Sequence, residues 1–255
     1  MPDFFQRITI VGTGLIGGSW GLALKRSGFE GALTGCDHPA VLKKALAAGA
    51  VDYGEADLRQ AVENASLVIL AAPVGEILGL IDQLKGVVPA DALVTDVGST
   101  KAMICQKARE TFNQRPLFLG GHPLSGKERS GIENASAGLF NGAPYVLTPW
   151  APEQMDDARA CAFRALAASC GARPVVMDAG AHDRAVAWLS HLPQLASTAL
   201  GSLIVEEDGL PLSLAASGLR DASRLAGSPY DIWRDICSSN QENIHQALDA
   251  LIRKL

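Results

Sequence analysis

The sequence predicts an α/β protein in which the first part forms a doubly wound parallel sheet and the last part is entirely helical. Up to Asp178, short apolar runs alternate with segments of helical periodicity, and beyond Asp178 the runs typical of strands end. The runs are apolar without alternation, as expected for strands that are covered on both faces. Strands and helices that alternate along the chain form parallel sheets with right-handed crossovers.

The expected elements of the first domain follow from these runs in chain order. Apolar runs, the clearest of which is LVILA at 67–71, predict strands at 7–11, 32–36, 67–71, 93–95, 117–119, 145–148 and 174–177. Helical spacing predicts helices at 16–27, 40–48 and 152–169. The end of the strand pattern sets the expected boundary, so that residues 1–178 form the first domain and residues 179–255 the second.

The second domain is expected to form a homodimer. Its run at 185–203 carries few charges on any face, and its last helix has an apolar stripe made of Ile244, Leu248, Leu251 and Leu255. Such helices are stable only when they are buried against other surfaces. A helical segment of under ~80 residues has a poor core of its own. A second copy supplies the missing partners through a two-fold interface, expected to bury roughly 2,000 Å² or more.

The composition indicates a soluble cytoplasmic protein. Of its 255 residues, 48% are hydrophobic and 19% charged, and 22 basic against 27 acidic residues give a net charge of −5. A mildly acidic chain without basic runs has no general affinity for nucleic acid or for an anionic membrane. The N-terminus lacks a signal peptide, and the longest apolar stretch, 66–81, is too interrupted to span a membrane. The five cysteines are scattered, which favours free thiols over disulfides or a metal site.

The first expected strand leads into a glycine-rich motif, VGTGLIG, that opens the first expected helix. In such a GxGxxG motif Gly12 permits a tight turn, Gly14 lets the backbone approach a pyrophosphate, and Gly17 allows helix and strand to pack closely. The helix N-terminus at Leu15 and Ile16 then faces the phosphates. The motif predicts a Rossmann-type nucleotide-binding domain. In the alternative interpretation these glycines only serve a tight turn.

The expected second strand ends at Asp37, which follows Gly17 at the distance typical of a ribose-binding carboxylate. That carboxylate would bind both ribose hydroxyls and repel a 2′-phosphate. Because no Arg or Lys follows before Lys43, the sequence favours NAD over NADP. The alternative is that Asp37 only caps the next helix.

Two further strand ends carry candidate catalytic groups. The segment DVGSTK contains Ser99, which alternatively serves as a helix N-cap. Lys101 is unusual there, because a cation in the first turn of a helix opposes the helix dipole. It has an anionic partner or is exposed. The segment GGHPLSG predicts a stiff loop holding His122, which could accept a proton from a substrate hydroxyl. The alternative is a structural histidine bonded within the loop.

The second domain carries two more candidates. His191 lies two residues before Pro193, and the proline cannot donate to the carbonyl of Leu189, so the helix should kink or open there. A histidine beside a helix break is a functional candidate, although a satisfied core histidine is the common case. Arg220 could bind a carboxylate in a fork geometry, or it could join an exposed Arg–Asp network.

Taken together, these segments resemble the prephenate/arogenate (cyclohexadienyl) dehydrogenase family of tyrosine biosynthesis. The matching pieces occur in the family's order and cover nearly the whole chain; they are VGTGLIGGS, LAAPV, DVGSTK, GGHPLSG, SHLPQ and GLRDASRLAGSPYDIWRDI. The resemblance implies an NAD-dependent enzyme that oxidises and decarboxylates a cyclohexadienyl acid without a metal. It also implies a homodimer with intertwined helices. The chain is expected to lack the mutase and ACT domains of some relatives, and therefore tyrosine feedback through such a domain.

The resemblance assigns roles to residues as follows. His122 is the catalytic histidine that engages the ring C4 hydroxyl, and Ser99 lies near that hydroxyl and the nicotinamide. His191 is the active-site histidine of the helical domain. The substrate site is made up of Arg220, Ser125, Gly126 and Trp233, of which Trp233 can come from the dimer partner. The cofactor site is made up of Gly12, Gly14, Leu15, Ile16, Gly17, Asp37, Ala72, Pro73 and Ser99.

Three questions stay open at the level of sequence. Prephenate and arogenate differ by a keto group against an ammonium, and Glu128 could attract the ammonium or be solvated. A β-hydroxyacid dehydrogenase is the alternative enzyme, but it would carry a catalytic lysine, and no lysine lies between Arg184 and Arg253. A catalytically silent NAD-binding regulator is the third possibility, and the joint presence of Ser99, His122 and Arg220 argues against it.

Overall fold

The protein is described by a computed structural model that covers residues 4–113, 115–127 and 129–254. The chain divides into two compact units, Met1–His182 and Asp183–Leu255. This division lies inside helix α7 (Ala179–Val186), which begins just after the last strand and continues into the second unit. In the part of the chain that the structure describes, no helix is both long and apolar enough to cross a bilayer.

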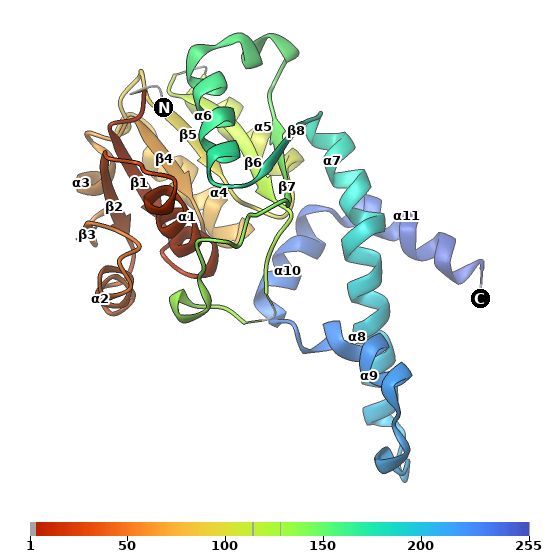
Figure 1. Ribbon diagram of the computed structural model, residues 1–255. Coiled ribbons are helices and arrows are strands. Elements are labelled where there is room, and N and C mark those ends of the chain that lie inside the picture. The colour runs from red at the N-terminus through yellow and green to blue at the C-terminus, as the bar shows by residue number, and fades with distance from the viewer. Residues whose placement is uncertain (1–3, 114, 128, 255) are drawn as a thin grey trace. The chain divides into compact units, whose positions relative to one another are not determined.

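The first unit is built on a twisted eight-stranded sheet, with the strand order β3-β2-β1-β4-β5-β6-β7-β8 (Figure 1). Strands β1 to β6 are parallel, β7 runs antiparallel to β6, and β8 is parallel to β7. The order of the first six strands is that of a doubly wound dinucleotide-binding sheet, as the sequence predicted. The strands are β1 (Arg7–Val11), β2 (Ala32–Cys36), β3 (Tyr53–Glu55), β4 (Leu67–Leu70), β5 (Leu93–Asp96), β6 (Leu117–Pro123), β7 (Pro144–Thr148) and β8 (Arg173–Val176).

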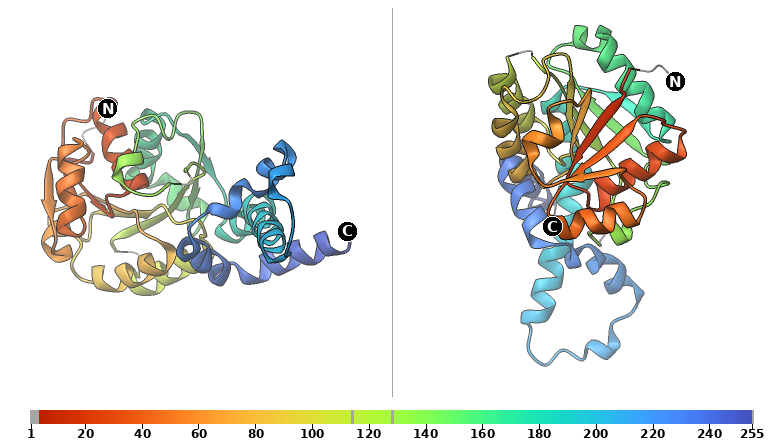
Figure 2. Two further views of the ribbon diagram at one scale, coloured as in Figure 1. Left: turned by 90° about the horizontal axis from the view of Figure 1, so that it is seen from below. Right: turned by 90° about the vertical axis from the view of Figure 1, so that its left-hand side faces the viewer.

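Helices cover both faces of this sheet, as the left-hand view of Figure 2 shows. On one face α1 (Leu15–Arg26) and α6 (Ala158–Ser169) bury an apolar cluster that centres on Trp20. The Trp20 ring contacts the rings of Phe140, Tyr145 and Phe163. The other face is covered by α3 (Leu58–Val62), α4 (Val74–Leu84) and α5 (Ala102–Phe112). Helix α2 (Pro39–Ala47) packs near α1 in a smaller cluster.

Among the elements of this unit that differ from the sequence prediction are β3 and the segment 152–169. Strand β3 was not expected, because its residues Tyr-Gly-Glu contain no apolar run; it pairs only with β2, at the edge of the sheet. The expected helix at 152–169 is two elements, a 3-10 turn (Pro152–Asp156) and α6. Asp157 separates them because its side chain accepts the N–H of Arg159 and caps α6.

The second unit is all-helical, as predicted. Its main helices are α8 (Leu192–Glu206), α9 (Ser217–Ser223), α10 (Tyr230–Ser239) and α11 (Gln241–Ile252), with 3-10 turns at Leu212–Leu214 and Arg224–Gly227. The expected opening before Pro193 is confirmed, because Ala187–His191 forms a π-helical turn directly ahead of α8. Pro193 has no N–H to bond the carbonyl four residues back, and a wider turn accommodates the loss.

The second unit has a small apolar interior. Its buried apolar residues, among those the structure describes, are Val186, Ala187, Ile236, Ile244 and Ala247. Many larger apolar side chains are instead exposed: Trp188, Leu189, Leu203, Val205, Leu210, Leu212, Leu214, Tyr230, Ile232 and Ile252. Of the expected stripe on the last helix, Ile244 is buried, Leu248 and Leu251 are half-buried, and Leu255 lies outside the described residues.

Candidate active site

The turn between β1 and α1 contains glycines that the fold itself requires. A Cβ at Gly12 would collide with the carbonyl oxygen of Ala71, and the φ of Gly12 is +89°. A Cβ at Gly17 would collide with the carbonyl oxygen of Gly12. Gly14 is different, because a Cβ there would meet nothing within 4 Å. Space is therefore left in front of the helix at Gly14, where a pyrophosphate can approach the backbone.

The N-terminus of α1 fits an anion. Gly14 is the N-cap and supplies no side chain to the first turn, which contains no acidic residue. Leu15 and Ile16 begin the helix, so that their N–H groups belong to the end where the helix dipole is positive. Together with the space at Gly14, this arrangement suits the phosphates of a dinucleotide.

Asp37 directly follows β2 and is half-buried beside the glycine turn. Its Oδ2 accepts the backbone N–H of Thr13 at 2.7 Å and the Thr13 hydroxyl at 3.2 Å, and its Oδ1 accepts the N–H of His38. The interpretation of Asp37 as a helix cap is wrong, because His38 is the N-cap of α2. A carboxylate can accept about four hydrogen bonds, so these contacts leave capacity for a ribose diol.

Two more cofactor candidates follow β4 at the same, carboxyl, edge of the parallel strands. Ala72 is half-buried, and Pro73 is exposed and is the N-cap of α4. The edge of the sheet at which β1, β2 and β4 end is where ligands bind in open α/β sheets. The residues that the sequence assigned to the cofactor thus gather at one edge of the first unit.

The buried thiols Cys36 and Cys170 are poor candidates for a nucleophile. All five cysteines lie within the described residues, and none of them forms a disulfide bond. The pKa of the Cys36 thiol is raised to about 11, mainly by burial and secondly by the negative charge of Asp37. Burial also raises the pKa of the Cys170 thiol to about 11. Both thiols therefore stay protonated at neutral pH and are poor nucleophiles.

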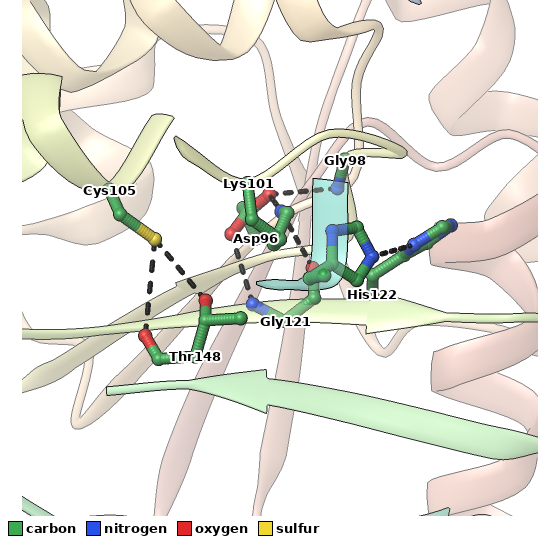
Figure 3. Close-up of polar contacts among 8 residues, drawn as sticks. Asp96, Gly98, Lys101, Cys105, Gly121, His122 and Thr148 are labelled. Atoms are coloured by element: carbon green, nitrogen blue, oxygen red, sulfur yellow. Dashed lines mark hydrogen bonds and ion pairs between the residues drawn. The ribbon is translucent and has the colours of Figure 1, made fainter. Parts of the chain in front are cut away.

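A fully buried ion pair joins the ends of β5 and β6 (Figure 3). The Lys101 ammonium contacts the Asp96 carboxylate and donates to the carbonyl oxygen of Gly121 at 2.8 Å. The same carboxylate accepts the N–H groups of Gly98 at 2.8 Å and Gly121 at 3.1 Å. These contacts fasten the loop that carries Ser99 to the residue that precedes His122.

The structure shows the partner of Lys101 and the residue that caps α5, both of which the sequence left open. Lys101 has an anionic partner, Asp96, rather than an exposed side chain. Lys101 is also the N-cap of α5, so the interpretation of Ser99 as a cap is wrong. Ser99 is half-buried in the loop between β5 and α5. Its hydroxyl is thus not committed to starting the helix.

His122 lies in a strand and not in the loop that the sequence predicted. Gly120, Gly121 and His122 extend β6, where they pair antiparallel with Thr148, Leu147 and Val146 of β7. The prediction was wrong because two glycines have low strand propensity. Here they allow close packing, since a Cβ at Gly121 would meet the carbonyl oxygen of Asp96 and the ring of Tyr145. The strand holds the His122 backbone rigidly and leaves its side chain half-buried.

His182 is a site residue that the sequence analysis missed. Its Nε2 lies 2.8 Å from Nδ1 of His122, with the two rings nearly perpendicular at 76°. His182 is buried in α7, and its N–H bonds to the carbonyl oxygen of Asp178. The one signal in the sequence is the pair His182-Asp183 in an otherwise Ala-rich helical stretch just after the last strand.

Ser125 and Gly126 follow β6, next to His122. Ser125 is half-buried, and its hydroxyl oxygen is buried without a hydrogen-bond partner among the described residues. Gly126 is exposed, and a Cβ there would meet nothing within 4 Å. A buried hydroxyl without a partner is unusual in a native protein, and it is consistent with a ligand at this position. Glu128, which the sequence raised as a possible partner for an ammonium, lies outside the described residues.

The second unit brings His191 and Trp233 together. His191 is buried at the end of the π-helical turn, and its ring meets that of Trp233 edge to face, with centroids 5.7 Å apart. Arg220 lies exposed on α9, and Arg224, four residues on, is also exposed. Asn240 bonds to His191 and was not singled out by the sequence.

Comparisons with known proteins match the two parts of the chain to the two domains of one enzyme family. Residues 20–176 match the family model of the prephenate dehydrogenase nucleotide-binding domain, and residues 178–255 match that of the prephenate dehydrogenase dimerization domain. Prephenate dehydrogenase of Bacillus subtilis (strain 168) is 33% identical over 262 residues, which cover 100% of this chain and 70% of the relative.

Two crystal structures extend the match to three dimensions. Prephenate dehydrogenase from A. aeolicus, in complex with hydroxyphenyl propionate and NAD+, is 30% identical with a TM-score of 0.89, covering 98% of this chain and 87% of that one. Synechocystis arogenate dehydrogenase is 33% identical with a TM-score of 0.81, covering 97% of this chain and 88% of that one. The chain therefore belongs to the prephenate dehydrogenase family and is an NAD-dependent oxidoreductase.

Proposed function

We propose that this chain catalyses the NAD+-dependent oxidative decarboxylation of prephenate or arogenate, giving 4-hydroxyphenylpyruvate or tyrosine in tyrosine biosynthesis. The observation that carries the proposal is the position of His122 on β6, held beside the Ser99 loop by the Asp96–Lys101 ion pair. A histidine and a serine are thereby fixed near the edge of the sheet that suits the dinucleotide. These are the groups needed to handle a hydroxyl whose carbon loses a hydride.

In the proposed reaction His122 draws off the proton of the ring C4 hydroxyl. A bound NAD+ would supply the acceptor for the hydride that leaves C4. Ser99 donates a hydrogen bond to the same oxygen, which becomes a ring ketone. The ketone is an electron sink, so that the bond from the ring to the departing carboxylate breaks, CO2 leaves, and the ring becomes aromatic. His122 returns its proton to the phenolic oxygen, and the balance closes without a metal.

His182 is proposed to orient this base. For Nε2 of His122 to accept the hydroxyl proton, Nδ1 must carry the ring proton and donate to Nε2 of His182, 2.8 Å away. A base held by a third group is the usual arrangement of an acid–base pair in enzymes. The buried His182 thus fixes both the ring plane and the tautomer of His122.

The substrate carboxylates are proposed to meet the second unit. Arg220 is the residue that the sequence assigned to a carboxylate, and Arg224 presents a second guanidinium about one helical turn later. Trp233, packed on His191, is proposed to line the same site. The Arg220 guanidinium must hold a carboxylate without blocking the one that departs.

Steady-state assays with NAD+ and each acid test the proposal. We expect turnover of prephenate, arogenate or both, and the ratio of the two kcat/KM values names the preferred substrate. Turnover of a small 3-hydroxy acid with neither cyclohexadienyl acid would contradict the proposal. So would NAD+ binding without turnover of any of these acids.

Cofactor preference is expected to follow Asp37. The double variant Asp37→Ser, His38→Arg should lower kcat/KM for NAD+ by roughly 10-fold or more. It loses the hydrogen bonds from the ribose to the carboxylate, and a hydrogen bond to a charged group contributes about 1.5–3 kcal/mol. The same variant should use NADP+ better than the wild-type chain does. Thr13→Val is the matched control, since it removes only the 3.2 Å hydroxyl contact to Asp37 and keeps the carboxylate. Equal kcat/KM values for NAD+ and NADP+ in the wild type would contradict this prediction.

The homodimer is proposed to form through the second unit. In one copy of the chain, Leu189 and Val205 are each 81% exposed, and Leu203 is 65% exposed. Apolar surface of this extent on helices is covered in stable proteins, and the match to a dimerization domain model points to a second copy. Such an interface would link folding to association.

The dimer prediction is tested by Leu189→Asp with Leu203→Asp. Neither change costs much in an isolated chain, where both side chains are exposed, but each would bury a charge in a dimer. We expect the wild type to sediment at twice the chain mass at low micromolar concentration, and the double variant to sediment as a less stable monomer. A wild-type monomer that is stable and active would refute the dimer.

A further inference from the structure

Asn240 occupies the junction between α10 and α11 in the second unit, and its side chain is buried. Its backbone serves both helices: its N–H bonds to the carbonyl of Ile236, and its carbonyl accepts the N–H of Ile244. An asparagine at the start of a helix usually caps it with its side chain. Here the side chain makes no capping bond. The amide is therefore available for another task.

The amide of Asn240 bridges two groups of the same unit. Its Nδ2 donates to the carbonyl oxygen of Asp183 at 2.8 Å and lies 3.3 Å from Nδ1 of His191. Its Oδ1 accepts the side-chain N–H of Asn243 at 2.7 Å. Because a backbone carbonyl only accepts, the atom that faces Asp183 must be the nitrogen. The orientation of the amide is thus fixed by its partner and not by convention.

The fixed amide determines the state of His191. An amide nitrogen donates and does not accept, so Nδ1 of His191 has to be the accepting nitrogen. A neutral imidazole that accepts at Nδ1 carries its proton on Nε2. A proton on Nδ1 would face the N–H of Asn240 instead of an acceptor. The edge-to-face contact with Trp233 holds the plane of the ring, and the π-helical turn that ends at His191 holds its backbone.

We propose that Asn240 is a positioning residue that holds His191 as the neutral Nε2–H tautomer, so that His191 donates a hydrogen bond to an oxygen of the substrate and does not act as a base. The catalytic part rests on the proposed function; the tautomer does not. The two histidines would then have separate tasks, since His122 accepts the hydroxyl proton and His191 is a fixed donor. The oxygens of a cyclohexadienyl acid that accept such a bond are its carboxylates and its keto group.

The tautomer can be read directly in the full-length protein by nitrogen-15 NMR of its histidine rings, because protonated and unprotonated ring nitrogens differ clearly in chemical shift. The His191 signals are those that disappear in His191→Gln. We expect the wild type to show a protonated Nε2 and an unprotonated Nδ1. A wild-type His191 with its proton on Nδ1 would overturn the proposal, whatever the activity of the protein.

Variants of Asn240 then test the cause. Asn240→Asp places an acceptor opposite Nδ1 and should move the His191 proton to that nitrogen. Asn240→Ala removes the bias and should give a mixture of tautomers. Asn243→Ala is the matched control: it removes the bond to Oδ1 of Asn240 but leaves both bonds of Nδ2, so the wild-type tautomer should persist. An unchanged tautomer in Asn240→Ala would show that Asn240 does not set it.

Kinetics separate the positioning role from a structural one. With NAD+ and the acid that turns over, Asn240→Asp should raise KM for the acid by roughly 10-fold or more, because the donor at Nε2 is lost. KM for NAD+ in this variant should stay within about two-fold of the wild-type value. In Asn243→Ala, KM for the acid and KM for NAD+ should both stay within the same range. If the tautomer of His191 changes but KM for the acid stays the same, His191 does not donate a hydrogen bond to the substrate, and this part of the proposal is wrong. If the tautomer is as proposed but neither acid turns over, the proposed function fails and the positioning stands.

Discussion

His122→Asn is expected to lower kcat with the cyclohexadienyl acid by roughly 100- to 10,000-fold, the contribution typical of a placed acid–base group. The fold should be unaffected, because β6 pairs with β7 through backbone bonds that do not involve the imidazole. NAD+ binding should also persist, since His122 is not among the residues expected to bind the cofactor. Loss of a proton acceptor acts on the transition state, so kcat should fall far more than KM rises.

The control for this variant is His245→Asn, which removes an exposed histidine of α11. It should leave kcat within about two-fold, in line with most surface substitutions. Unfolding in urea and a titration with NAD+ show whether each variant keeps its fold and its cofactor site. Near-normal kcat in His122→Asn would mean that this histidine is structural, and the proposed chemistry would then need another base.

Lys101→Met is expected to destabilise the protein by about 3–5 kcal/mol, because it leaves the buried Asp96 carboxylate without its cation. Both side chains of this pair are fully buried, and the methionine has nearly the volume of the lysine stem. The change also removes the bond to the Gly121 carbonyl, which helps to align β6 with the Ser99 loop. We therefore expect kcat to fall in whatever fraction of the protein remains folded.

The same helix provides the control for this variant. Lys107 of α5 pairs with Asp82 at 2.6 Å, but its side chain is 33% exposed and that of Asp82 is 59% exposed. Exposed pairs contribute about 0–1 kcal/mol, so Lys107→Met should change the free energy of unfolding by no more than that. Both variants are compared with the wild type by urea unfolding at one protein concentration. Equal losses of stability in the two variants would contradict the role given to the buried pair.

Local sequence patterns predicted the glycine turn after β1 and the position of Asp37 after β2, because both depend on short-range geometry. The glycines at 12, 14 and 17 lie close together in the sequence where α1 begins, and Asp37 directly follows β2, the strand that pairs with β1. The π-helical turn before Pro193 was predictable for the same reason, since a missing N–H acts four residues away. In both cases the cause and the effect are close in the sequence.

Contacts between distant segments could not be predicted in this way. Asp96 and Lys101 are near neighbours, but their burial depends on Gly121 of another strand. The bond between His122 and His182 joins residues sixty positions apart, and that between Asn240 and His191 joins residues of different helices. The roles of Ser99, Arg220 and Trp233 also depend on such contacts and on a bound substrate, so they stay predictions.

The most direct test of the proposed chemistry measures NADH and CO2 in the same reaction, with NAD+ and prephenate or arogenate as substrates. The mechanism couples loss of the C4 hydride to loss of the carboxylate, because the ketone that forms at C4 is what drives decarboxylation. We predict one CO2 for each NADH, with 4-hydroxyphenylpyruvate or tyrosine as the aromatic product. NADH formation without CO2, or no turnover of either acid, would contradict the account.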